Sequence, residues 1–137
     1  MKLKFNKLRR NQKRLIKVKG TERNRIFFTQ KNNFILKSIS YSLLTEFQLK
    51  AAYNLLKKKI KKNGHIIPHV FCNIGLTKKP VEVRMGKGKG GKIACYVYPV
   101  RPGKVIFELV GVNSALAEKA LTLALGKLPI FGKIIQI

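Results

Sequence analysis

The chain has 137 residues, which is enough for one domain with a modest core, and 45% of them are hydrophobic. Its 30 Lys and Arg outnumber five acidic residues, so the formal net charge is +25 and a polyanion is needed to relieve the self-repulsion. Nucleic acid is therefore the favoured partner, ahead of a membrane surface, because no apolar run reaches the length of about 18 residues that spans a bilayer.

Residues 1–24 are cationic with scattered apolar residues, and they predict an extended arm that is ordered mainly by RNA. A solvated tail is the alternative. The arm also resembles a mitochondrial transit peptide, but it contains no Ser, so we interpret it as mature sequence. Residues 25–137 are predicted to form a single domain. Ten cations in and next to the arm are candidate RNA contacts: Lys4, Lys7, Arg9, Arg10, Lys13, Arg14, Lys17, Lys19, Arg23 and Arg25.

Residues 25–39 predict two short strands around Lys31-Asn32-Asn33, because Asn tolerates tight turns. Thr45-Glu46-Phe47-Gln48 matches a capping box and predicts a helix that ends at Asn63-Gly64. More lysines crowd the end of this helix than its dipole needs, so phosphate contact is an alternative to a solvated face. The candidates here and before the next loop are Lys57, Lys58, Lys61, Lys62, Lys78 and Lys79.

Four further segments predict strands. Residues 65–72 form the first, in which Pro68 indicates an edge or a bulge, and residues 80–85 form the second. Residues 93–100 and 104–110 flank Arg101-Pro102-Gly103, which suits a type II turn, so these two strands are expected to form a β-hairpin.

A second helix is predicted to begin at Asn113 or Ser114 and to end before Pro129. Its expected apolar face consists of Leu116, Ala120, Leu123 and Ala124. Residues 130–137 predict a last short strand. The order of elements indicates an α+β, two-layer sandwich, with two helices packed on a mixed or antiparallel sheet and a basic extended N-terminal arm.

Between the predicted strands lies a loop in which glycines alternate with cations: Val83-Arg84-Met85-Gly86-Lys87-Gly88-Lys89-Gly90-Gly91-Lys92. Glycines allow bends and close approach, and the cations suit phosphates. A magnesium–nucleotide site is disfavoured because no Ser or Thr follows Lys87, Lys89 or Lys92, so magnesium would lack its hydroxyl ligand. A dinucleotide site is disfavoured because β-like sequence follows the glycines.

No pattern predicts catalysis, a cofactor or a small-molecule substrate. The glutamates form no cluster, and Glu82 and Glu108 are interpreted as solvent-facing strand residues. His65, His69, Cys72 and Cys95 could converge on zinc, but ordinary histidines and buried free thiols are favoured, so no metal is expected.

A series of motifs in one order and spacing resembles a known family. They are Lys79-Pro80, Val83 to Gly90, Pro102-Gly103-Lys104-Val105, Phe107-Glu108, Gly111-Val112, Leu116-Ala117-Glu118, Ala120 and Lys127-Leu128-Pro129-Ile130. With these the chain resembles the universal large-subunit ribosomal proteins of the L-sixteen family, strongly from about Leu44 onward and more weakly over residues 1–43. Two features depart from the family pattern. One is Gly91, and the other is the segment from Gly91 to Arg101, which is one residue longer than is usual in the family.

The resemblance implies a non-catalytic α+β protein bound to large-subunit rRNA, beside other ribosomal proteins and near tRNA at the aminoacyl site and peptidyl transferase region. By position, Arg84, Lys87 and Lys89 would face RNA, and Gly86, Gly88 and Gly90 would allow close approach, with Met85 in the same loop. The absence of Asp and Trp and the many Lys, Ile and Asn suit an AT-rich organelle genome. We therefore expect a mitochondrial ribosome, with a plastid or a bacterial cytoplasm as alternatives.

Overall fold

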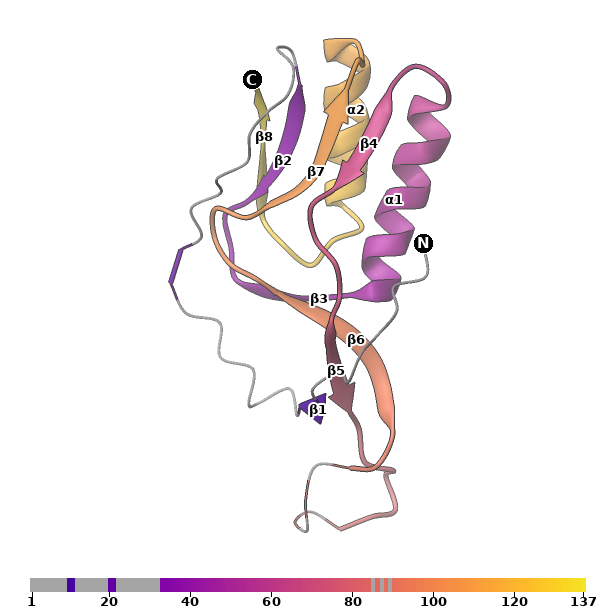
Figure 1. Ribbon diagram of the computed structural model, residues 1–137, viewed down its shortest axis with the longest axis vertical. Coiled ribbons are helices and arrows are strands. Elements are labelled where there is room, and N and C mark those ends of the chain that lie inside the picture. Colours follow the sequence, from indigo (N-terminus) through magenta and orange to yellow (C-terminus); the bar gives the residue numbers. More distant parts are fainter. Residues whose placement is uncertain (1–9, 12–19, 22–32, 85, 87, 89) are drawn as a thin grey trace.

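The computed structural model describes residues 10–11, 20–21, 33–84, 86, 88 and 90–137. These residues form two helices and eight strands, and the strands are arranged in two four-stranded sheets (Figure 1). The α+β prediction is confirmed, although the strands are divided between two sheets. The predicted boundary between the arm and the domain, at residue 24, lies outside the described residues and stays a prediction.

The first sheet, which we call the body sheet, has the order β4-β7-β2-β8, and all its neighbours are antiparallel. Its strands are β4 (His65–Pro68), β7 (Val105–Val110), β2 (Phe34–Ser38) and β8 (Gly132–Gln136). Pro68 ends an edge strand, as its missing donor predicts. Strand β2 confirms the second strand predicted in residues 25–39, whereas residues 25–32 lie outside the description.

The helices α1 (Glu46–Ile60) and α2 (Ser114–Leu125) form the second layer. They share a hydrophobic core with β2 and β7, which includes Leu56, Leu121, Leu36 and Phe107. On α2 the buried residues are Ala117, Ala120, Leu121 and Ala124, at the spacing of one helix face. The prediction for Leu123 was wrong: its position lies outside that face, and it is 48% exposed.

The second sheet, which we call the ribbon sheet, has the order β1-β5-β6-β3. Its strands are β1 (Arg10–Asn11), β5 (Ile74–Thr77), β6 (Ile93–Val100) and β3 (Ser42–Thr45). The C-terminal half of β6 pairs with β3, and its N-terminal half pairs with β5. The β5–β6 pair therefore projects away from the helices and carries residues 78–92 at its far end (Figure 1).

The prediction that residues 93–100 and 104–110 form a β-hairpin was wrong. The turn itself forms, since Gly103 has a φ of 91° and the Lys104 N–H donates to the Arg101 carbonyl at 3.1 Å. However, the two strands enter different sheets. The reason is Ser38 of β2, whose carbonyl accepts from the Gly103 N–H and whose N–H donates to the Lys104 carbonyl, both at 2.8 Å.

The strand predicted at residues 80–85 is also wrong. Residues 81–83 form a turn, in which the Val83 N–H donates to the Pro80 carbonyl at 3.3 Å. The strand before the loop is β5 instead, and the predicted strand at residues 65–72 ends at Pro68. Glycine within a strand often marks a close approach of the neighbouring chain, and a Cβ at Gly75 would lie 3.0 Å from the Ile93 side chain on β6. Close packing of the two strands explains this glycine.

The predicted capping box at the start of α1 is confirmed. The Thr45 hydroxyl accepts from the Gln48 N–H at 3.3 Å, and the Gln48 side chain accepts from the Thr45 N–H at 3.0 Å.

We predict that Thr45→Ala lowers the free energy of unfolding by about 1 kcal/mol, whereas Thr45→Ser, which keeps the hydroxyl, lowers it much less. Urea denaturation measures both. Equal losses for Ala and Ser would contradict a capping role.

Candidate nucleic-acid interface

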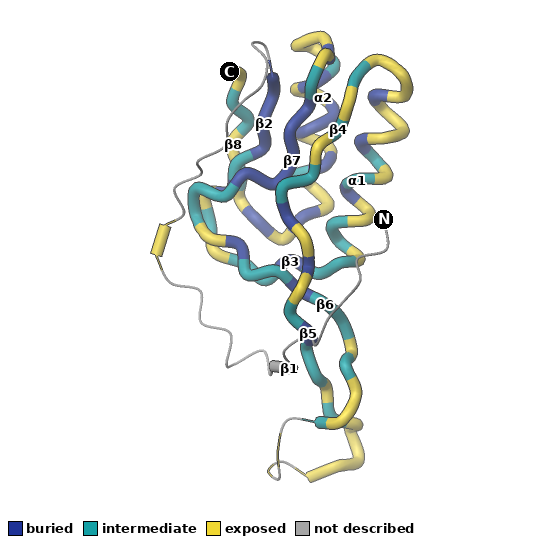
Figure 2. The backbone as a smooth tube through the Cα atoms, viewed as in Figure 1, coloured by how far each residue is buried: buried dark blue, intermediate teal, exposed yellow. Residues whose placement is uncertain are grey.

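The loop of residues 78–92, which we call the glycine-rich loop, is the most projecting part of the described chain (Figure 1). It joins β5 to β6, and its described residues are mostly exposed (Figure 2). Arg84 and Lys78 are exposed, whereas Lys79 is half-buried and donates from its ammonium to the Gly86 carbonyl. Val81 and Val83 are 97% and 53% exposed. A tip that presents both cations and uncovered apolar side chains has the composition of a contact surface.

The loop backbone requires its glycines. Gly86, Gly88 and Gly90 have φ values of 108°, 94° and 87°, which other L-residues rarely adopt. A Cβ at Gly90 would lie 3.4 Å from the Lys78 carbonyl oxygen across the loop, whereas a Cβ at Gly86 or Gly88 would meet nothing within 4 Å. The glycines at 86 and 88 are thus set by conformation and leave open space on the outer side. Met85, Lys87 and Lys89 lie outside the described residues.

The N-terminal part of the chain reaches the ribbon sheet at β1. This short strand runs parallel to β5, with Arg10 opposite Gly75 and Asn11 opposite Leu76. The backbone at Arg10 therefore lies beside the strand that leads into the glycine-rich loop. The other predicted arm contacts lie outside the described residues: Lys4, Lys7, Arg9, Lys13, Arg14, Lys17, Lys19, Arg23 and Arg25.

The lysines at the end of α1 form a second cationic site. Lys57, Lys58, Lys61 and Lys62 are exposed, and the Lys61 N–H caps the helix by donating to the Lys57 carbonyl at 3.0 Å. In Figure 1, α1 runs from β3 to the end of the body opposite the glycine-rich loop. The fold therefore does not bring the two groups of predicted RNA contacts together, but places them at opposite ends.

Few carboxylates neutralise these cations. Glu46 pairs with Lys50 at 2.6 Å on the first turn of α1, far along the helix from the lysine-rich end. Within the part of the chain that the structure describes, Lys57, Lys58, Lys61 and Lys62 form no ion pair with an acidic side chain. Their charge is available to an external anion such as a phosphate.

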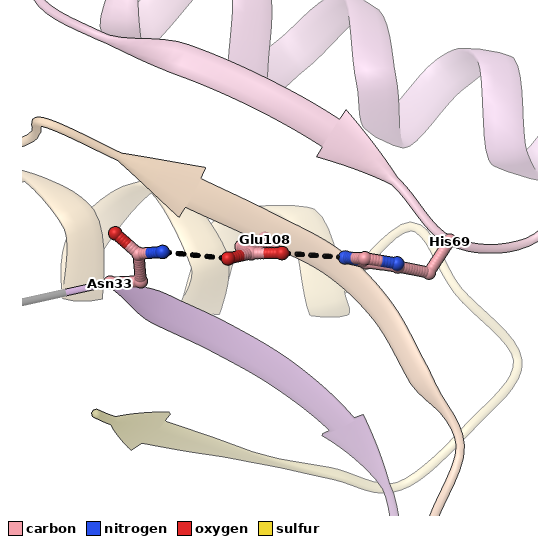
Figure 3. A network of polar contacts seen from close by, with 3 residues as sticks. All are labelled: Asn33, His69 and Glu108. Carbon is pink, nitrogen blue, oxygen red and sulfur yellow. Dashed lines mark hydrogen bonds and ion pairs between the residues drawn. The ribbon is translucent and has the colours of Figure 1, made fainter. Parts of the chain in front are cut away.

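A buried polar network crosses the body sheet, and the sequence did not predict it (Figure 3). The Asn33 side-chain amide donates to one Glu108 oxygen at 2.7 Å, and His69 Nε2 contacts the other at 2.7 Å. Glu108 is only 3% exposed, so its interpretation as solvent-facing was wrong. The apolar run Val105 to Val110 is typical of a strand buried on both faces, in which a single carboxylate needs partners.

This network is suited to holding strands rather than to chemistry. Both Glu108 oxygens are engaged, and they link β7 to the start of β2 and to the residue after β4. Among the described residues no three His, Cys, Asp or Glu side chains are arranged to hold a metal ion. In that same part of the chain no helix is long and apolar enough to cross a membrane.

Comparison with known proteins places the chain in a family. The sequence model described as "Ribosomal protein L16p/L10e" matches residues 3–135. The chain belongs to this family. The match extends through the basic N-terminal segment, where the sequence resemblance was weaker. The loop and the arm are therefore both parts of the L16p/L10e pattern.

Bacterial relatives agree with this assignment. The large ribosomal subunit protein uL16 of Treponema denticola is 45% identical over 123 residues, covering 90% of this chain and 86% of the relative. The uL16 protein of Leptospira biflexa is 38% identical over 124 residues, covering 90% and 88%. That of Psychrobacter cryohalolentis is 46% identical over 94 residues, covering 69% and 68%.

Removing Glu108 should expose the role of the buried network. We predict that Glu108→Leu lowers the free energy of unfolding by about 1–3 kcal/mol, because the buried Asn33 amide then lacks its acceptor. Glu108→Gln keeps an acceptor oxygen and should cost less. Urea denaturation is the measurement, and Glu82→Gln in the exposed loop is the control that should change nothing. A Leu variant as stable as the Gln variant would contradict this role.

The two free cysteines should differ in reactivity. Burial raises the pKa of the Cys72 thiol to about 12, and the charges of Glu46 and Cys95 add to the effect. Cys95 is only partly buried. Because the thiolate is the nucleophile, we predict that iodoacetamide at pH 8 modifies Cys95 well before Cys72 in the folded protein. Mass spectrometry follows both sites, and urea should equalise their rates. Faster modification of Cys72 in the folded chain would contradict its burial.

Proposed function

We propose that this protein is a structural constituent of the large ribosomal subunit that binds large-subunit rRNA and performs no chemistry itself. The observation that carries the proposal is the family match over residues 3–135, together with relatives named as large-subunit proteins uL16. The net charge of +25 supports an RNA partner, because the rRNA phosphates would relieve the self-repulsion of the chain.

The separation of the cationic sites supports a particular way of binding. The lysine-rich end of α1 and the glycine-rich loop lie at opposite ends of the molecule, so one straight RNA helix on one face would not serve both (Figure 1). The protein would instead be embedded between separate RNA segments, with other ribosomal proteins nearby. The predicted contacts at Lys57, Lys58, Lys61 and Lys62 would hold one segment, and Lys78 and Lys79 would hold another.

We further propose that the loop tip, Arg84 to Gly90, faces tRNA near the aminoacyl site and the peptidyl transferase region. The projection of the β5–β6 pair supports this, because it carries the tip well beyond the helices (Figure 1). The positive φ values at Gly86, Gly88 and Gly90 would let the backbone approach an RNA surface closely. The boundary between an RNA-binding arm at residues 1–24 and a domain at residues 25–137 is part of the same proposal.

We also propose that the ribosome in question is mitochondrial. The absence of Asp and Trp from the chain supports an AT-rich organelle genome, although the relatives compared are bacterial. Fractionation of the source cells, followed by immunoblotting of mitochondrial, plastid and cytoplasmic ribosomes, tests this. Detection on plastid or bacterial cytoplasmic ribosomes would replace the mitochondrial assignment without affecting the ribosomal one.

Sedimentation tests the central proposal. The tagged chain should sediment with large ribosomal subunits through a sucrose gradient after a high-salt wash. Binding of the isolated chain to protein-free large-subunit rRNA should weaken about 10³- to 10⁵-fold between 50 and 200 mM salt if six to ten phosphates are contacted. A chain that stays at the top of the gradient while large subunits sediment normally would refute a structural role in the subunit.

Replacing Arg84 tests the loop separately. We predict that subunits carrying Arg84→Ala assemble normally but accommodate aminoacyl-tRNA or form peptide bonds roughly tenfold more slowly, because one charge-assisted contact is lost. Fast kinetics on purified subunits provide the measurement. Lys50→Ala, which removes a cation already paired with Glu46 on α1, is the control of equal charge. Equal rates for the Arg84 and Lys50 variants would leave the loop without its proposed role.

A further inference from the structure

Three large apolar side chains are exposed together at one end of the body sheet. Ile39 and Tyr41, between β2 and β3, are 59% and 50% exposed, and Phe131, directly before β8, is 78% exposed. We call these three residues the apolar corner. It lies where β2 leads into β3, on the body and away from the tip of the glycine-rich loop (Figure 1). A group of exposed apolar side chains on a charged protein marks a contact surface.

Hydrogen bonds hold the two segments of the corner together. The Phe131 carbonyl accepts from the N–H groups of Ile39 at 2.8 Å and Ser40 at 3.4 Å, and the Ser40 hydroxyl accepts from the Phe131 N–H at 2.9 Å. The Ser38 hydroxyl closes the turn by donating to the Ser40 carbonyl at 2.8 Å. The backbone that carries the exposed side chains is therefore fixed before any partner binds, which lowers the entropic cost of binding.

The surroundings of the corner are cationic. Lys37 on β2 pairs in register with Lys133 on β8, directly next to the corner. Arg101 and Lys104 lie on the turn that Ser38 binds, and Lys127 precedes Phe131 in the chain. The chain segments that pass through this end of the sheet, within residues 33–41, 98–105 and 126–137, contain no Asp or Glu. The corner is thus an apolar surface that is bordered by positively charged residues.

We propose that the apolar corner is a stacking platform for unpaired RNA bases, with Phe131 and Tyr41 against the bases and the neighbouring lysines against the phosphates. Exposed aromatic rings beside cations are the combination that single-stranded nucleic acid requires. A second copy of the chain is disfavoured as the occupant, because two chains that each carry a net charge of +25 repel. The inference rests on the proposed function and extends it to a second surface.

A tryptophan reporter tests the platform directly, since the chain contains no Trp. The Phe131→Trp variant should lose most of its fluorescence when protein-free large-subunit rRNA is added, because stacking on bases quenches the indole. The matched control is Phe47→Trp, on the first turn of α1, where Phe47 is 69% exposed next to Glu46. Quenching confined to the Phe131 site supports the proposal. Equal quenching at both sites, or none at position 131, overturns it.

The salt dependence of binding separates stacking from charge. Phe131→Ala should weaken binding to the same rRNA roughly 5- to 150-fold while leaving the slope of log K against log salt unchanged. Lys133→Ala should instead reduce that slope by about 0.7–0.9, which is the effect of losing one phosphate contact. Circular dichroism checks that both variants fold. A Phe131→Ala variant with unchanged affinity, or with a changed slope, would contradict the platform.

Failure of this inference is distinguishable from failure of the proposed function. If the Phe131→Ala chain and the unmodified chain both sediment with large subunits, but rRNA leaves the tryptophan at position 131 unquenched, only the platform is refuted. If rRNA leaves that fluorescence unchanged and the purified proteins of the large subunit alter it, the occupant is a protein and the platform is again refuted. If neither chain sediments with large subunits, the proposed function itself fails.

Discussion

The burial of β7 on both faces is the constraint on which the rest of the fold depends. On one face Phe107 and Leu109 join the core formed with α1 and α2. On the other face Glu108 is withdrawn from solvent and satisfied by Asn33 and His69. A carboxylate in such a place is tolerated only with hydrogen-bonding partners, so the network fixes how β2 and the chain after β4 lie against the central strand.

With the body fixed in this way, the ribbon sheet can project. Strand β6 pairs with β3 beside the body and with β5 farther out, and the turn at Gly103 returns the chain to β7. The glycine-rich loop is consequently supported by paired strands up to Thr77 and from Ile93. The lysines of α1 lie at the opposite end of the body. This arrangement matches a small protein embedded between RNA segments better than one lying on a single RNA surface.

Local signals in the sequence were sufficient for much of the fold. The capping box at Thr45, the cap at Asn113 and the turn at Gly103 all form as their residue types predict, because each is decided by contacts within a few residues. The pairing of strands was predicted less well. The expected hairpin failed because Ser38, more than 60 residues away in the chain, binds both sides of the turn. Strand β5 was not predicted, and the glycine within it packs against Ile93 of the neighbouring strand, a contact that only the fold reveals.

The sequence by itself determined the family, the α+β class, the strong positive charge and the glycine-rich loop, because composition and motif spacing are properties of the chain alone. The tertiary structure decided where the charges and the polar groups lie. It separated the lysines of α1 from the loop, buried Glu108 and brought Ile39 and Ser40 beside Phe131. These placements depend on which distant strands pair, and strand pairing is set by packing across the whole molecule rather than by neighbouring residues.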